Sequence, residues 1–279
     1  MKSTKKNELV RNRPGIEAVW SACQRFCIAA LLFTLSMAAG AEEVLLHIDT
    51  REGVTVPVYR IQVDHPVATV VLLSGGPGGF GKVVDGKPSS ANFLIRSREL
   101  FAKAGFNVVA MGKASDNADL TNTRNRLAPE HLQDIRAVVN YLKKERDIPV
   151  WLVGTSLGTI SATAAAISFG NDHLAGLVLT SSIVSRSKEG AVPTLDLASI
   201  RIPVLVLHNA NDACKFCSPD EVPQIVSGLK SAPVLKQIMV SGGTGVTGNP
   251  CDALHYHGYI GMEGAVVEQI AAWIKSPSP

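Results

Sequence analysis

The sequence contains the stretch Val150-Trp151-Leu152-Val153-Gly154-Thr155-Ser156-Leu157-Gly158. Its last five residues have the form G-x-S-x-G, follow the apolar run 148–153 and precede a helix of small residues predicted at 159–169. Between a strand and a helix, this pattern forces serine into a sharp turn with its hydroxyl exposed above the sheet. Glycine is needed at positions 154 and 158 because a side chain there would collide with neighbouring elements. The alternative for Ser156 is a helix-capping serine in an ordinary loop.

Short apolar blocks alternate with helical patterns along the rest of the chain, which predicts a mostly parallel sheet with helices on both faces. We expect an antiparallel opening pair at 43–47 and 54–63, followed by six buried strands at 68–73, 106–111, 150–153, 177–180, 204–207 and 235–240, eight strands in all. Helices are expected at 93–104, 129–146, 159–169, 219–229 and 264–274. Ser218 and Glu221 have the spacing of a capping box at the start of the fourth of these helices.

Residues 1–41 have the pattern of a secretory signal peptide. They carry six basic side chains, then the apolar run Phe26–Ala39, then the small-residue end Ala39-Gly40-Ala41. An uncleaved membrane anchor is the alternative, but the apolar run is shorter than the ~20 residues that a spanning helix needs. We therefore expect an exported protein, periplasmic or secreted, whose mature chain is a single α/β domain at residues 42–279.

Charge excludes one class of partner. Cleavage after residue 41 removes six of the 27 Lys and Arg and two of the 24 Asp and Glu, leaving 21 basic and 22 acidic side chains. The remaining charges are mixed along the chain, with no basic run or aromatic pattern of the kind that binds nucleic acid. We expect no nucleic-acid partner, and the near-neutral balance leaves the charge of a substrate open.

A nucleophilic serine needs a histidine to accept its proton and a carboxylate to orient that histidine. The order of candidates here, serine, then acid, then histidine, resembles the α/β-hydrolase family over nearly all of residues 42–279. The resemblance implies the α/β-hydrolase fold, with an eight-stranded mostly parallel sheet. Only residues 182–201 separate the sixth and seventh strands, so we expect no large cap domain.

The resemblance also implies a place for each partner of Ser156. The acid follows the strand at 202–207, where Asp212 stands in the matching loop; Asp220 is a competing carboxylate that better suits the first turn of a helix. The histidine precedes the last helix, where His257 begins the sequence His-Gly-Tyr and His255 is the alternative. The other histidines considered are expected on the surface: His47, His65, His131 and His173.

The glycine-rich segment Ser74-Gly75-Gly76-Pro77-Gly78-Gly79 is similar to the oxyanion loop of the family, with serine where histidine is often found. The expected oxyanion donors are the backbone N–H groups of Gly76 and Leu157, since Pro77 has no N–H. Residues 76–82 also fit the phosphate-binding pattern G-x-x-x-x-G-K. Val83 then replaces the Ser or Thr that holds magnesium, and no helix is predicted to begin there, which argues against nucleotide binding.

Three cysteines remain after cleavage. In an exported protein two of them are expected to pair, and we predict a disulfide between Cys214 and Cys251, with Cys217 to Cys251 as the alternative. The first pairing would join the loop of the acid to the loop of the histidine. Cys214 and Cys217 also form a C-x-x-C, and with Cys251 and His255 they make a possible zinc set, but no second C-x-x-C or histidine pair supports it.

The sequence thus predicts an exported serine hydrolase that needs no metal or cofactor. Carboxylic ester hydrolysis through an acyl-enzyme is the predicted reaction, on a small-molecule ester-like substrate, and residues 83–92 are placed to cover the cleft. Two alternatives stay open. One is a peptidase or acyltransferase with the same three residues, and the other is a non-catalytic binding protein on the same fold.

Overall fold

The computed structural model describes residues 42–117, 119–170 and 172–279. The predicted signal peptide at residues 1–41 lies outside the described residues. No helix in the described ranges has the length and the apolar character that crossing a membrane requires.

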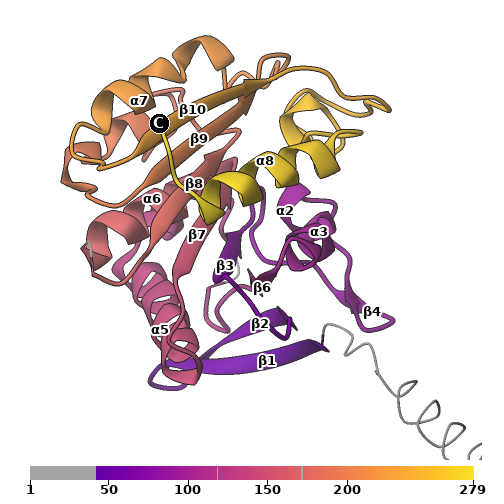
Figure 1. Ribbon diagram of the computed structural model, residues 1–279, viewed down its shortest axis with the longest axis vertical. Coiled ribbons are helices and arrows are strands. Elements are labelled where there is room, and N and C mark those ends of the chain that lie inside the picture. Colours follow the sequence, from indigo (N-terminus) through magenta and orange to yellow (C-terminus); the bar gives the residue numbers. More distant parts are fainter. Residues whose placement is uncertain (1–41, 118, 171) are drawn as a thin grey trace, which may run out of the picture. The chain divides into compact units, whose positions relative to one another are not determined.

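One eight-stranded sheet forms the centre of the described chain, in the order β1-β2-β6-β3-β7-β8-β9-β10 (Figure 1). The pairs β1·β2 and β2·β6 are antiparallel and the other pairs are parallel. The predicted eight-stranded, mostly parallel sheet is therefore confirmed. Its strands are β1 (Glu42–Arg51), β2 (Val54–Gln62), β3 (Ala68–Leu73), β6 (Phe106–Met111), β7 (Val150–Thr155), β8 (Gly176–Thr180), β9 (Val204–Asn209) and β10 (Leu235–Val240).

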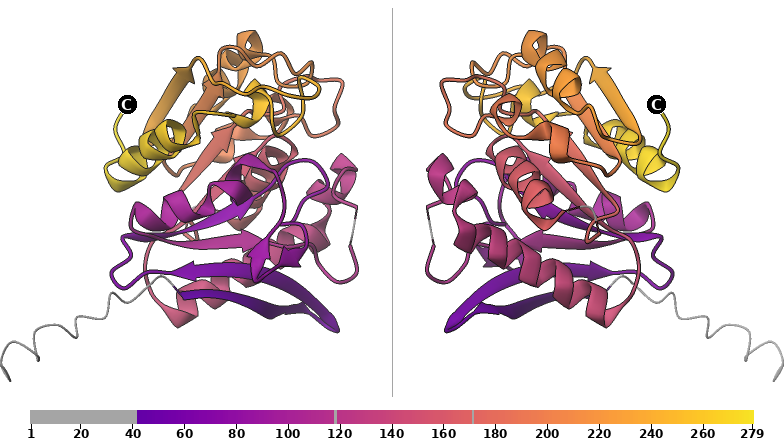
Figure 2. Two further views of the ribbon diagram at one scale, coloured as in Figure 1. Left: turned by 90° about the vertical axis from the view of Figure 1, so that its right-hand side faces the viewer. Right: turned by 90° about the vertical axis from the view of Figure 1, so that its left-hand side faces the viewer.

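Helices cover both faces of the sheet (Figure 2). Successive side chains of a strand point to opposite faces, so Val71 and Leu73 of β3 join one core cluster and Val70 and Leu72 join the other. The first cluster includes side chains of α5 (Pro129–Glu145), α6 (Leu157–Phe169) and α7 (Pro223–Gly228). The second includes side chains of α2 (Phe93–Arg96), α3 (Arg98–Lys103) and α8 (Glu263–Lys275).

Three local expectations were wrong. The helix expected at 93–104 is two helices, α2 and α3, separated at Ser97. The helix expected at 219–229 divides into the 3-10 turn η3 (Pro219–Glu221) and α7, because Pro223 has no N–H to continue the first turn. The predicted capping box is also absent, since the Ser218 side chain makes no capping hydrogen bond.

A short helix and a short hairpin were not predicted. Helix α4 (Thr123–Leu127) is capped by Asn122, whose side chain accepts a hydrogen bond from the Arg124 N–H. The second is a hairpin of β4 (Val83–Val84) and β5 (Lys87–Pro88), which lies within the segment expected to cover the cleft.

The carboxyl ends of parallel strands meet at one edge of the sheet, where open α/β sheets bind their ligands. Loops that follow β3, β7, β9 and β10 lie at this edge, and the last of them contains the 3-10 turn η4 (Tyr256–Gly258). Between β8 and β9 the chain forms only the 3-10 turns η1 (Val192–Thr194) and η2 (Leu197–Ser199). As expected, no helical cap is inserted there.

Candidate active site

Ser156 occupies a strained turn between β7 and α6. Its φ of 52° and ψ of −128° are a conformation that residues with a side chain rarely adopt. Close packing on both sides holds the turn. A Cβ on Gly158 would lie 2.0 Å from the Leu73 carbonyl oxygen, and one on Gly75 would lie 2.7 Å from the Ser156 Cβ. The sequence pattern therefore marks a tight serine turn, for the steric reason expected.

Asp212 and His257 come together although 45 residues separate them. His257 Nδ1 donates a hydrogen bond to Asp212 Oδ2 at 2.8 Å, and both side chains are buried. The Cys214 backbone N–H donates to the second carboxylate oxygen, Oδ1, at 2.9 Å. The Asp212 bond fixes the proton on Nδ1, so Nε2 is the ring nitrogen left to accept a proton.

Burial alone would raise the pKa of the Asp212 carboxyl. Hydrogen bonds from His208 and His257 outweigh that effect and hold the pKa below its ordinary value. The carboxylate is therefore ionised at neutral pH and faces the His257 ring as an anion.

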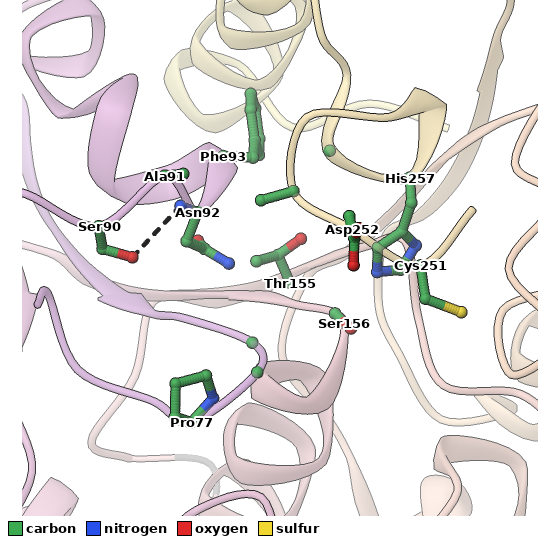
Figure 3. A pocket seen from close by; sticks show the side chains of 14 residues that line it. Pro77, Ser90, Ala91, Asn92, Phe93, Thr155, Ser156, Cys251, Asp252 and His257 are labelled. Carbon is green, nitrogen blue, oxygen red and sulfur yellow. Dashed lines mark hydrogen bonds between the residues drawn. The ribbon is translucent and has the colours of Figure 1, made fainter. Parts of the chain in front are cut away.

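Ser156 and His257 line the same cavity, which has a volume of about 270 Å³. Figure 3 shows the serine on its turn and the imidazole reaching the cavity from the η4 segment, with no hydrogen bond between them. Catalytic hydrogen bonds are often long or misaligned without substrate and tighten in the reactive complex. The structure thus brings Asp212 and His257 into contact and places Ser156 on the same cavity as His257.

The glycine-rich loop forms another wall of this cavity through Gly75, Gly76 and Pro77. The Gly76 N–H donates to no backbone carbonyl in the described chain. Leu157 is the first residue of α6, so its N–H has no acceptor within the helix. Neither predicted oxyanion donor has a hydrogen-bond acceptor among the described residues, and both lie on segments that border the cavity.

No protein-family model matches the chain, and neither does any curated protein sequence. Solved structures do match. An esterase from Pyrococcus furiosus aligns with a TM-score of 0.61 and 16% identity, over 84% of this chain and 91% of its own. An esterase from Pyrobaculum calidifontis aligns with a TM-score of 0.56 and 18% identity, over 96% of this chain and 95% of its own. A serine hydrolase involved in carbazole degradation aligns with a TM-score of 0.58 and 11% identity, over 84% of this chain and 99% of its own.

The strand order and these structural likenesses indicate the same fold. The chain has the α/β-hydrolase fold. The fold resemblance inferred from the sequence is confirmed, and the serine turn, the acid loop and the histidine loop lie on this α/β-hydrolase sheet after β7, β9 and β10.

The other residues weighed for these roles lie elsewhere. His255 does not line the cavity, and its buried Nδ1 has no hydrogen-bond partner among the described residues. Asp220 is exposed in η3. His131, which was expected on the surface, is buried in α5 because it packs beneath the glycine-rich loop and bonds to the Ser161 hydroxyl at 3.0 Å.

His208 is a contact of Asp212 that the sequence reasoning missed. Its Nε2 lies 3.4 Å from Asp212 Oδ2 and 2.8 Å from the Cys217 carbonyl oxygen. A carbonyl can only accept, so the Nε2 of His208 carries the proton. The only signal in the sequence was its place at the end of the acid's strand, four residues before Asp212.

Cys214 and Cys251 are joined in a disulfide, with their Cα atoms 4.5 Å apart and a sequence separation of 37 residues. This is the first of the two pairings expected. The bond connects the acid loop to the loop that contains η4, and Cys251 itself lines the cavity. Cys217 is a buried free thiol, and burial raises its pKa well above the ordinary value.

Two alternative sites can be compared with the structure. Potential ligand atoms of Cys214, Cys217 and His257 lie within 4.8 Å of one another, but the Cys214 sulfur is already bonded to Cys251. His255 is not part of this group, unlike in the zinc set considered above. The segment after Lys82 forms the β4–β5 hairpin instead of a helix, so no helix N-terminus faces a phosphate on this loop.

Proposed function

We propose that the protein is a serine hydrolase that cleaves carboxylic esters. The observation that carries the proposal is the bond between His257 and Asp212 at the rim of a cavity that also contains Ser156 on its strained turn. The fold similarity to esterases supports it, although at 11–18% identity that likeness concerns the fold alone.

In the proposed reaction the Ser156 oxygen forms a bond to the ester carbonyl carbon while its proton passes to His257 Nε2. The carbonyl electron pair moves onto oxygen, and the Gly76 and Leu157 N–H groups stabilise that negative charge. The pair then re-forms the carbonyl as the alcohol leaves with the proton from His257. Water then attacks the acyl-enzyme carbonyl carbon and gives its proton to His257, and the acid product leaves as the Ser156 oxygen takes that proton back. Asp212 stabilises the imidazolium in both halves of the reaction.

The cavity favours a small acyl group. Its volume of about 270 Å³ lies below the usual ~300–1,000 Å³ of sites for drug-sized ligands. No helical cap covers the edge of the sheet between β8 and β9, so a substrate can enter from water. The cavity is instead bordered by Ser90, Ala91 and Asn92, next to the β4–β5 hairpin. We therefore propose short, soluble esters over bulk lipid.

Export remains part of the proposal. The first strand, β1, begins at Glu42, directly after the predicted cleavage, and a disulfide near the site suits an oxidising compartment. Mass spectrometry of protein from the periplasm or medium of an expressing cell tests it. A mature chain beginning at Glu42 is expected, and retention of residues 1–41 on a protein inside the cell would contradict it.

The function is tested by turnover of chromogenic acetate, butyrate and octanoate esters. The wild-type protein is expected to hydrolyse the short esters, and Ser156→Ala is expected to abolish turnover. Ser168→Ala is the matched control, because Ser168 is an exposed serine on the same helix. Turnover of peptide substrates in place of esters would favour the peptidase. A folded protein that hydrolyses none of these substrates would favour the binding-protein alternative.

A further inference from the structure

Arg126 is a buried cation that neither the sequence reasoning nor the proposed reaction uses. It lies in α4, the helix that was not predicted, and its side chain is 1% exposed. No carboxylate forms an ion pair with it in the part of the chain that the structure describes. Burying a charge without a counter-ion costs free energy, so the groups that contact the guanidinium must stabilise it.

The guanidinium donates three hydrogen bonds, all to neutral oxygens. Nε donates to the Leu120 carbonyl at 2.7 Å, Nη1 to the Ser161 hydroxyl at 3.1 Å and Nη2 to the Gly76 carbonyl at 2.9 Å. Because all three acceptors are neutral, the positive charge is not neutralised locally. Burial lowers the pKa of Arg126 to about 9, so the group is still protonated at neutral pH.

Two of these acceptors belong to the segments that carry the proposed oxyanion donors. Gly76 lies in the glycine-rich loop and has a φ of +56°. Ser161 lies in α6, the helix that begins at Leu157. One planar group therefore spans the two segments that must be held at a fixed separation if both N–H groups are to reach one oxygen.

The surroundings of Arg126 hold it in place. The Ser161 hydroxyl accepts from Arg126 and donates to His131 Nε2 at 3.0 Å. Burial, followed by the nearby Arg126 charge, lowers the pKa of His131 to about 4, so this ring is neutral and able to accept. Leu120, whose carbonyl accepts from Arg126, packs closely against Gly78, since a Cβ on Gly78 would lie 2.6 Å from the Leu120 side chain.

We propose that Arg126 is a positioning residue for the oxyanion site. Its guanidinium ties the Gly76 loop to α6, and its unpaired charge lies behind the loop, where positive potential favours a developing oxyanion. This inference rests on the proposed function, because it assigns Arg126 a part in that reaction. Arg126 does not line the cavity and so acts through Gly76 and the helix instead of touching substrate.

The test compares Arg126→Met, which removes the charge at similar volume, with Arg126→Lys, which keeps the charge and loses the planar fork. Arg98→Met is the matched control. Arg98 is also buried, donates to the Ile95 carbonyl and lies outside the cavity lining. For each variant, kcat and KM are measured on a short ester together with the inhibition constant of a trifluoromethyl ketone, which forms a tetrahedral oxyanion adduct with the serine.

Removing one oxyanion donor typically costs about 100- to 1,000-fold in kcat. We expect Arg126→Met to lose about 100-fold in kcat with KM changed less than threefold, and to lose ketone affinity by a similar factor. Arg126→Lys should lose about tenfold in both, and Arg98→Met should change neither by more than threefold. A merely structural role would reduce the active fraction without changing the ketone affinity of the remaining folded protein.

A folded Arg126→Met with kcat and ketone affinity within threefold of wild type would overturn the proposal. If Arg126→Met fails to fold, Arg126→Lys decides, since an unchanged kcat and ketone affinity there would overturn it equally. The proposed function fails separately: it fails if the wild-type protein neither hydrolyses esters nor binds the ketone.

Discussion

Asp212→Asn changes one atom of the proposed triad and almost nothing of its shape. Oδ1 of Asp212 accepts the Cys214 backbone N–H at 2.9 Å, and Oδ2 faces His257 Nδ1 at 2.8 Å. In the variant the amide oxygen must stay on the Cys214 side, because an NH₂ cannot accept. The NH₂ group then points at His257 Nδ1.

The consequence for His257 is a change of tautomer. Facing a donor, Nδ1 has to accept, so the ring proton moves to Nε2, where a base is needed for the Ser156 hydroxyl. The negative charge that stabilises the imidazolium is also lost. The same change in another Ser-His-Asp enzyme costs about 10⁴ in kcat, which corresponds to about 5.5 kcal/mol of transition-state stabilisation.

We expect Asp212→Asn to lower kcat on a short ester by about 10⁴-fold, with the circular dichroism spectrum unchanged. The assay is steady-state hydrolysis of a chromogenic ester at neutral pH, with Asp220→Asn as the control because Asp220 is an exposed carboxylate in the next turn. The control should keep its kcat. A folded Asp212→Asn with more than a tenth of wild-type kcat would refute the assignment of the acid.

Three further perturbations test the packing around the site. Replacing Cys214 and Cys251 together by serine opens a 37-residue loop, which should lower the free energy of unfolding in urea by about 4 kcal/mol and remove its dependence on reductant; unchanged stability would contradict the disulfide. His131 has a pKa of about 4 in the folded chain against an ordinary value of 6.5, so stability should fall by about 2 to 3 kcal/mol as pH drops from 6.5 to 4. His131→Gln should lose this pH dependence, and the same change of unfolding free energy with pH in both proteins would refute the role of His131. Gly158→Ala would put a Cβ 2.0 Å from the Leu73 carbonyl oxygen and should destabilise by more than about 3 kcal/mol in urea, whereas Gly264→Ala, which meets nothing within 4 Å, should not; equal effects would be a contradiction.

The strands were predictable because their signal is local. Buried parallel strands are continuous apolar runs, and five of the eight strands are buried at every position. The serine turn was equally predictable, since Gly154 and Gly158 are required by contacts that any such turn makes. The ends of helices were less predictable. Pro223 was placed inside one predicted helix, but it begins α7, a separate helix after the 3-10 turn η3.

Arg126, His131 and His208 show what a linear pattern does not reveal. A charged or titratable side chain is normally expected on the surface, yet all three are buried, and the partners of Arg126 and His131 are distant in sequence. Arg126 is satisfied by oxygens from Gly76 and Ser161, which lie 50 and 35 residues away. No periodicity within α4 indicates such partners, so the buried network under the glycine-rich loop became visible only in the folded chain.

The role of Ser156 is tested most directly by the site at which the protein reacts with a fluorophosphonate. Its phosphorus forms a bond with an activated serine oxygen and releases fluoride, so intact mass and peptide mapping identify the residue. We predict one adduct per chain, on Ser156, formed at a rate that His257→Ala abolishes and His255→Ala leaves nearly unchanged. Labelling of a different serine, or no labelling of a folded protein, would contradict it.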